Sequence, residues 1–350
     1  MKKWFKRTFW FLLILIGSYL IYQHEMVVYG VRQGLGQLEI LRKAKPIEEV
    51  LADTTFPDSL KQKIHFIQEV REYAVSQLGL VDSDNYTSLY NQKGKPVLWV
   101  VSACPPYRLE EHKWNYPLLG ELGYKGFFKE ELAQEEALTL ENKGFDVSVG
   151  TVSAWSTLGF FSDPILSNML NREKGDLAEL IIHELTHATL FVKSDATFNE
   201  NLATFIGKKG AEQFLEDTYG ENNEALESYL HWESDKDTYA RFLVNETQQL
   251  KQVYKLFEEA EKNDSLDRVK SNAIRALFEK AKDLPLKRKE RFYFINHTDT
   301  LPNNTYFTGY AMYREQQSDL DSLFQQEHNR DIKSFIAAMK TKYGDGGVNR

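Results

Sequence analysis

Residues 180–205 read LIIHELTHATLFVKSDATFNENLATF. The spacing of apolar residues in this stretch predicts the secondary structure in the middle of the chain. Apolar residues occupy most positions from Leu180 to Phe191, a pattern typical of a helix that is buried on most sides. Just before it, Asp176 and Glu179 have the spacing of a helix capping box. The sequence therefore predicts a buried helix that begins near Asp176.

Two histidines lie on one face of this predicted helix. His183 and His187 are four residues apart, so both imidazoles can reach one metal ion. Glu184 is rotated about 100° from His183, where it can act as a base on metal-activated water rather than as a ligand. This is the H-E-x-x-H pattern of zinc peptidases. Since only 8 of 350 residues are histidine, a chance match is expected on the order of once in a hundred such chains, which favours a metal site over two packed histidines.

A catalytic zinc site needs a third protein ligand and leaves one position open. Asp195 and Glu200 are the nearest downstream candidates. A turn at 193–197 would fold a second helix back and bring Glu200 near the histidines. Thr197 and Glu200 also have capping-box spacing, so the same carboxylate has a purely structural alternative. The spacing favours Glu200 as a ligand and leaves the helix cap as the alternative.

The segments around this helix predict a small sheet before it and helices after it. Three runs have the composition or alternation of strands, namely 95–104, 123–128 and 145–155. Beyond residue 176 the apolar spacing is helical, with a helical hairpin that turns near Asn263. We expect an α+β, mostly α-helical fold, in which a small β-sheet packs beside the H-E-x-x-H helix and a helical C-terminal half. One domain is expected over 24–350, mixed over about 24–175 and helical over about 176–350.

The first 22 residues differ in charge and hydrophobicity from the rest of the chain. MKKWFKR is basic, and a charge-free run of 15 residues follows from Thr8 to Tyr22. This pattern predicts a signal anchor or transmembrane segment over 1–23, with its basic end in the cytoplasm. A cleaved signal peptide is the alternative, although no cleavage site of small residues follows. In both cases the body is expected on the extracytoplasmic side, in the periplasm or at the cell surface.

Composition excludes several classes of protein. The formal net charge is -8 and no basic stripe stands out, which argues against nucleic-acid binding. The single cysteine, Cys104, rules out an internal disulfide and a cysteine-based zinc site. It ends an apolar run, so we expect it to be buried rather than nucleophilic.

The stretch H-E-L-T-H followed by F-N-E-N-L-A-T-F resembles the gluzincin arrangement, in which a glutamate on the next helix, often within N-E-x-x-A, completes the metal site. Most of the chain resembles the bacterial "putative aminopeptidase" family. The runs that carry this resemblance are GQLEIL near 36, PPYRLEEHKWNYPLLGELGYKGFF from 105, VSAWSTLGFFSDPILSNML from 152 and PNN near 302.

The resemblance implies a zinc metallopeptidase with one Zn²⁺ ion and a peptide substrate. It implies His183, His187 and Glu200 as ligands and Glu184 as general base. Many gluzincins have an aspartate four residues after the third ligand, and this chain has Thr204 there. Asp195 is therefore the residue expected to orient a histidine.

Further residues are candidates for substrate contacts. The oxyanion needs a second donor beside the metal, and among Tyr306, Tyr310 and His297 we select Tyr310 as catalytic. Polar residues expected in the cleft are Ser156, Thr157 and Asp163, and those weighed for holding a substrate amine are Glu121, Glu130 and Asp163. The alternatives to an aminopeptidase are a zinc endopeptidase or cell-wall amide hydrolase, and a non-catalytic metal-binding helical module. The sequence does not indicate the oligomeric state.

Overall fold

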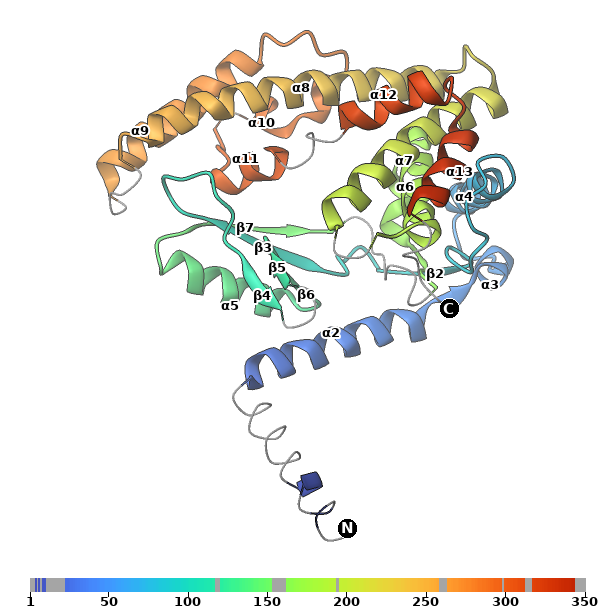
Figure 1. Ribbon diagram of the computed structural model, residues 1–350, viewed down its shortest axis with the longest axis horizontal. Coiled ribbons are helices and arrows are strands. Elements are labelled where there is room, and N and C mark those ends of the chain that lie inside the picture. Colours follow the sequence, from blue (N-terminus) through green and yellow to red (C-terminus); the bar gives the residue numbers. More distant parts are fainter. Residues whose placement is uncertain are drawn as a thin grey trace.

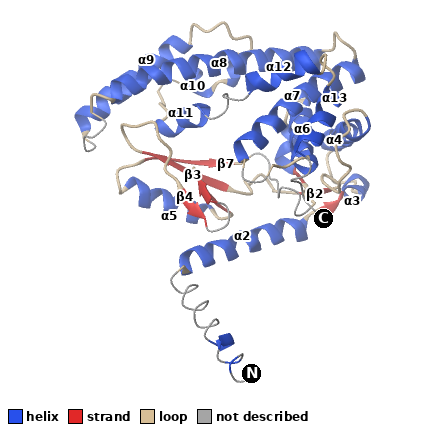
Figure 2. Ribbon diagram, in the orientation of Figure 1, coloured by secondary structure: helices blue, strands red, loops and turns tan. Residues whose placement is uncertain are grey.

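The computed structural model describes residues 4, 6, 8–10, 23–116, 120–152, 162–192, 195–257, 263–297, 299–311 and 317–343. Most of these residues lie in helices, and the short strands are confined to the first half of the chain (Figure 2). The expected α+β, mostly α-helical fold is therefore confirmed. Ser156 and Thr157, expected in a cleft, lie outside the described residues.

A three-stranded antiparallel sheet is the centre of the first half. In spatial order its strands are β6 (Lys125–Phe127), β3 (Trp99–Cys104) and β7 (Asp146–Thr151). Val101 and Ala103 of β3 are buried against Ala133 and Ala137 of α5 (Glu130–Glu141), because alternate residues of a strand face the same side. The three predicted strands are confirmed, with shorter bounds than the apolar runs.

Several shorter strands were not predicted. They are β1 (Lys45–Pro46), β2 (Ser88–Tyr90) and β8 (Ile165–Leu166), which form a second sheet, and β4 (Trp114–Tyr116) and β5 (Gly120–Leu122), which form a hairpin. Strands of two or three residues are too short to show an alternating pattern. Their pairing therefore depends on contacts between distant segments.

Helices make up the remainder. The α-helices are α2 (His24–Lys43), α3 (Ile47–Ala52), α4 (Asp58–Ser76), α6 (Lys174–Thr189), α7 (Ala196–Tyr219), α8 (Glu224–Tyr254), α9 (Asp264–Ala281), α10 (Tyr293–Asn296), α11 (Asn304–Ala311), α12 (Gln317–Glu327) and α13 (Ile332–Tyr343), and the 3₁₀ helices are η1 (Ser167–Asn171) and η2 (Lys289–Arg291). Figure 1 shows α8 and α9 along one side of the molecule and α2 along the opposite side, with the sheet, α6 and α7 between them. The predicted helical hairpin is α8 and α9, and Asn263 caps α9 by accepting hydrogen bonds from the backbone N–H groups of Ser265 and Leu266.

The largest hydrophobic core surrounds α6. Leu177, Ile181 and Leu185 of α6 are fully buried and pack in one cluster with apolar residues of α4, α7 and α13. A second cluster joins α8, α9 and α11. The expected buried helix is therefore confirmed, and it lies at the centre of the larger core.

The predicted start of α6 is wrong by two residues. The helix begins at Lys174 and its N-cap is Glu173, so Asp176 lies inside the first turn. The carboxylate of Asp176 accepts a hydrogen bond of 2.5 Å from Arg291, a residue far along the chain. A capping box can be read from neighbouring residues alone. Here the carboxylate of Asp176 forms an ion pair with Arg291 instead of capping the helix.

Helix α2 packs beside the small sheet. The hydroxyl of Tyr29 and the amide of Gln33 both donate to the carbonyl oxygen of Gly126 in β6, each at 3.0 Å. Of the predicted anchor over 1–23, residues 1–3, 5, 7 and 11–22 lie outside the described residues. Among the helices that the structure describes, none combines the length and the apolar character that a bilayer crossing requires.

Cys104 is buried, as expected. Its thiol donates to the carbonyl oxygens of Arg108 and Glu110, and burial raises its pKa to about 12. The thiolate form is therefore scarce at neutral pH, which agrees with a structural rather than nucleophilic role.

Candidate metal centre

Two histidines and a glutamate meet where α6 and α7 pack together. The Nε2 atoms of His183 and His187 are 3.1 Å apart. The carboxylate of Glu200 places Oε2 3.5 Å from Nε2 of His183 and Oε1 3.4 Å from Nε2 of His187. The side chain of His187 is 4% exposed and that of Glu200 is 59% exposed, so the cluster has a buried floor and opens to solvent on the α7 side.

These separations suit one ion held by all three side chains. In tetrahedral coordination with bonds of about 2.0 to 2.2 Å, ligand atoms lie about 3.3 to 3.6 Å apart. The two histidine nitrogens are 3.1 Å apart, each lies 3.4 to 3.5 Å from a different oxygen of Glu200, and one ligand atom from each residue can be chosen with all three within 4.8 Å of one another. Three protein ligands leave a fourth position for water or substrate, as in catalytic rather than closed structural sites. The cluster can therefore hold a divalent metal ion.

The capping alternative for Glu200 is wrong. Helix α7 begins at Ala196, and its N-cap is Asp195, whose Oδ1 accepts a hydrogen bond of 3.0 Å from the backbone N–H of Phe198. Thr197 is therefore inside the helix and cannot be the cap. The carboxylate of Glu200 instead faces the two histidines. Because Asp195 is engaged in the cap, its predicted role as the partner of a histidine gains no support from its contacts.

Asn199 holds the connection between the two helices, a role that the sequence reasoning missed. Its side chain is buried, accepts a hydrogen bond from the N–H of Val192 and donates one to the carbonyl of Val192, both at 2.8 Å. This pair of bonds ties the first turn of α7 to the residues that leave α6. Glu200 follows directly in sequence, so Asn199 sets the place from which Glu200 reaches the histidines.

A close approach of the two helices occurs at Gly207. A Cβ atom there would lie 2.9 Å from the carbonyl oxygen of Glu179 and 3.1 Å from Cβ of His183. Only a residue without a side chain fits at this separation. Gly207 therefore lets α7 lie against the turn of α6 that carries His183.

Gly207→Ala is expected to push the helices apart. The added methyl group meets backbone, so we expect a loss of about 1 to 3 kcal/mol in the free energy of unfolding, together with weaker metal binding. Urea unfolding and metal titration measure the two effects. Gly30→Ala is the matched control, because Gly30 is also helical and nothing lies within 4 Å of a Cβ there. Unchanged metal affinity in Gly207→Ala would show that the close approach does not set the site.

Glu184 lies on the buried side of the cluster. The residue is 8% exposed, and its Oε2 has no hydrogen-bond partner among the described residues. A buried carboxylate oxygen without a partner is costly, and such exceptions often mark functional groups. The Nδ1 atom of His187 is likewise buried without a partner in the described part of the chain.

Tyr86 is a further residue that the sequence reasoning did not find. Its side chain is fully buried, and its hydroxyl has no partner within the described ranges. Burial, and then the negative charges of Glu184 and Asp163, raise the pKa of its phenol well above the usual value. Its backbone φ of 62° lies in the left-handed region, which is rare for an aromatic residue. No pattern in the sequence indicates this placement.

Asp163 is not an exposed cleft residue. It is 1% exposed, its backbone N–H donates to Asn85 and its carbonyl accepts from the N–H of Tyr86. Glu121 and Glu130, the other residues considered for a substrate amine, are exposed, and Glu121 pairs with Lys113 at 3.6 Å. The structure therefore does not single out an amine-binding carboxylate among these three.

The charges of the cluster are strongly coupled. Burial alone would lower the pKa of His183, but Glu200 and Glu184 outweigh it and raise the pKa above its ordinary value. Burial opposes ionisation of Glu200, yet His183 and His187 hold its pKa well below the usual range. Without metal, the ionised form of Glu200 and the protonated form of His183 therefore stabilise each other.

Metal binding is expected to release a proton around neutral pH. A histidine must lose its proton to ligate, and the pKa of His183 is raised, so affinity should increase as pH rises through that pKa and level off above it. Calorimetric titration with zinc in buffers of different ionisation enthalpy measures the number of protons released. Affinity that stays constant between about pH 5.5 and 8 would contradict ligation by His183.

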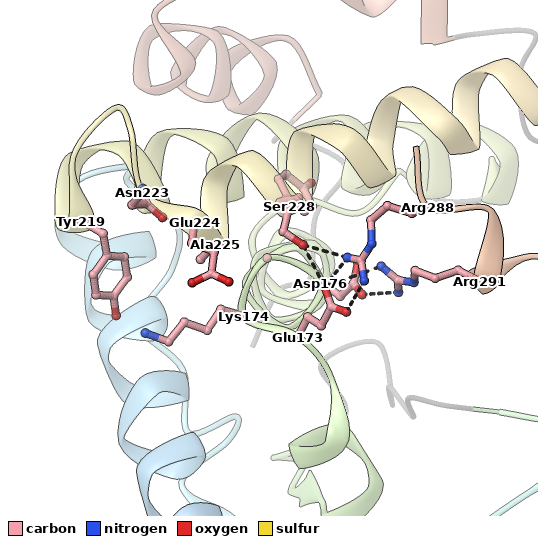
Figure 3. A pocket seen from close by; sticks show the side chains of 12 residues that line it. Glu173, Lys174, Asp176, Tyr219, Asn223, Glu224, Ala225, Ser228, Arg288 and Arg291 are labelled. Atoms are coloured by element: carbon pink, nitrogen blue, oxygen red, sulfur yellow. Dashed lines mark hydrogen bonds and ion pairs between the residues drawn. The ribbon is translucent and has the colours of Figure 1, made fainter. Parts of the chain in front are cut away.

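A cavity of about 580 Å³ lies at the other end of α6 (Figure 3). Four of its charged side chains form ion pairs, since Arg288 contacts Glu173 at 2.6 Å and Arg291 contacts Asp176 at 2.5 Å. Arg288 in particular lowers the pKa of Glu173 to about 2. These pairs tie the first turn of α6 to η2. None of the candidate metal ligands lines this cavity, so it is separate from the metal centre.

Comparison with known proteins identifies the family of the chain. A family model described as "Putative aminopeptidase" matches residues 28–345, which is most of the chain. The chain belongs to this aminopeptidase family. No curated protein and no solved structure matches the chain.

For this member of the aminopeptidase family, the contacts of the expected oxyanion donors among the described residues do not join Tyr306, Tyr310 or His297 to the metal cluster. The ring of Tyr310 contacts the rings of Tyr239 and Tyr306 within the second core. His297 is exposed and stacks on Tyr293. Tyr124, between β5 and β6, is half-exposed; burial of its phenol and then the charge of Glu200 raise its pKa.

Proposed function

We propose that the chain is a zinc-dependent aminopeptidase. The observation that carries the proposal is the convergence of His183, His187 and Glu200, whose ligand atoms lie within 4.8 Å of one another, with the buried Glu184 beside them. The family description names the same activity. A purely structural metal site would have a fourth protein ligand and no use for a carboxylate at position 184.

The donor set favours zinc. Two imidazoles and one carboxylate are typical of catalytic zinc sites, whereas magnesium and calcium prefer oxygen donors throughout. A zinc ion held here would act as a Lewis acid and supply water with a pKa near about 7. His183, His187 and Glu200 are the residues that would hold it.

Glu184 has the chemistry of the general base. It accepts a proton from the attacking water and returns it to the amine of the leaving product. Its Oε2 is free for this purpose, since no described side chain or backbone group bonds it. Tyr86 is fully buried and close enough to this carboxylate for its charge to help raise the pKa of the phenol.

Tyr310 is our proposed second donor to the oxyanion, and Tyr124 is a second candidate because it is close enough to Glu200 for that charge to raise its pKa. The loss of one such donor typically lowers kcat by about 10² to 10³-fold. Measurement of kcat in Tyr310→Phe and in Tyr124→Phe shows which of the two tyrosines is the donor, because only the loss of the donor should lower kcat by this factor. A wild-type kcat in Tyr310→Phe would remove Tyr310 from the mechanism.

The substrate class is tested with matched peptides that carry a free or an acetylated amino terminus. We expect a much higher kcat/KM for the free peptides and loss of hydrolysis after chelation of the metal. Equal cleavage of both, at internal bonds, would identify an endopeptidase. Cleavage of cell-wall amides alone would identify an amide hydrolase. Retained metal with no hydrolysis of any of these substrates would support a non-catalytic helical module and overturn the proposal.

We further propose that residues 1–23 anchor the chain in a membrane, with the body on the extracytoplasmic side. The basic start and the charge-free run from Thr8 to Tyr22 support this placement. Flotation of the full chain with vesicles tests the anchor, and protease accessibility in intact cells tests the side. A full-length chain that stays in solution would contradict the anchor.

A further inference from the structure

Helix α2 has two faces of different character. Its inner face packs on β6, where Tyr29 and Gln33 both donate to Gly126 and Gly36 lies against the ring of Phe128. Farther along, Ile40 on the same side is buried at 3% exposed. This face anchors the helix to the body of the protein and fixes its rotation.

The opposite face exposes an apolar stripe. The stripe consists of Val27 (36% exposed), Val28 (44%), Val31 (55%), Leu35 (62%) and Leu38 (55%). At about 100° per residue, these five side chains fall within an arc of about 100°, and the arc faces away from Gln33, Gly36 and Ile40. Single exposed apolar residues are ordinary, but five on one arc of one helix indicate a surface that something covers.

The position of the helix in the chain indicates what covers the stripe. The charge-free run that we propose as an anchor ends at Tyr22, and α2 begins at His24. If the run enters a bilayer, the start of α2 must lie at the bilayer surface. A 20-residue helix is about 30 Å long, so its whole stripe can lie along that surface. Charged residues such as Arg32 and Glu39 border the stripe, as in helices that lie in the interface of a membrane.

We propose that α2 lies flat on the membrane, with the stripe at the boundary between headgroups and acyl chains. This inference rests on the proposed membrane anchor and is independent of the proposed peptidase activity. The partner is the lipid bilayer itself. The anchor and α2 together would hold the body against the membrane in one orientation, because α2 is fixed to β6 on its other face.

A second copy of the chain is the rival occupant. Val28, Val31, Leu35 and Leu38 have the alternating spacing of three and four residues found in a coiled-coil seam. That pattern covers about two heptads, whereas a stable coiled coil usually needs three or four. Gly30 and Gly34 also border the stripe and weaken an isolated helix pair. These features favour the bilayer.

The test uses the full-length chain in phosphatidylcholine vesicles with an environment-sensitive fluorophore on single introduced cysteines. Val31→Cys and Leu35→Cys report on the stripe. Lys43→Cys, on a polar side of α2, and Glu216→Cys, on an exposed position of α7, are the controls. The native Cys104 is buried and has a pKa of about 12, so it does not compete for the label.

Spin-labelled lipid is expected to quench the stripe probes several-fold more than the controls, and a water-soluble quencher should show the reverse order. Vesicle-bound chain whose stripe probes are as accessible to water as Glu216→Cys would overturn the inference and leave the anchor intact. Chain that does not float with vesicles would overturn both. Leu35→Cys chains that form disulfide-linked dimers in high yield, with no lipid quenching, would assign the stripe to a second copy.

Discussion

Glu184→Gln is expected to remove most of the peptidase activity while the protein still binds its metal. Glutamine has nearly the same shape as glutamate but cannot accept the proton of the attacking water. General-base catalysis typically contributes about 10² to 10⁴-fold, so kcat/KM should fall by that factor. The measurement is hydrolysis of a free-amine peptide, with metal content determined on the same sample.

The fold should tolerate this change. Oε2 of Glu184 is buried without a partner among the residues described, so loss of the charge should leave the thermal midpoint unchanged or higher. Glu216→Gln, an exposed change on α7, is the matched control. Full activity in Glu184→Gln would rule out Glu184 as the base. Loss of metal together with activity would instead show that Glu184 contributes to binding.

Glu200→Ala is expected to weaken metal binding by more than about 100-fold. Residues that merely support a ligand already change affinity by about 10 to 100-fold, and Glu200 is proposed as a ligand itself. Its carboxylate lies 3.4 and 3.5 Å from the Nε2 atoms of the two histidines. Competition with a chromogenic chelator measures the affinity.

The structure also predicts what Glu200→Ala should leave unchanged. Asp195, not Glu200, caps α7, so no capping energy is lost. The Glu200 side chain is 59% exposed, and a histidine that loses this partner can give up its proton, so the metal-free protein should change little in its free energy of unfolding. Glu216→Ala on the same helix should leave both affinity and stability unchanged. Wild-type affinity in Glu200→Ala would show that Glu200 is not a ligand.

The pairing of His183 with His187 was predictable because it is local. Four residues along any α-helix return a side chain to the same face, so spacing alone places both imidazoles together. The burial of α6 was predictable for the same reason, since its apolar residues cover most of the helix surface. The start of α6 was predicted wrongly because Asp176, the expected cap, forms an ion pair with Arg291, which is 115 residues away in the sequence.

The position of Glu200 required the tertiary structure. Its approach to the histidines depends on the hydrogen bonds between Asn199 and Val192 and on the close helix packing at Gly207. Tyr86 and Tyr124 come to the site from segments roughly 60 to 100 residues earlier in the chain, and no sequence pattern marks either. The sequence by itself determined which groups could bind a metal, because helix periodicity is local. Only the packing of distant segments decided which carboxylate faces the histidines, and it brought Tyr86 within the influence of Glu184 and Tyr124 within that of Glu200.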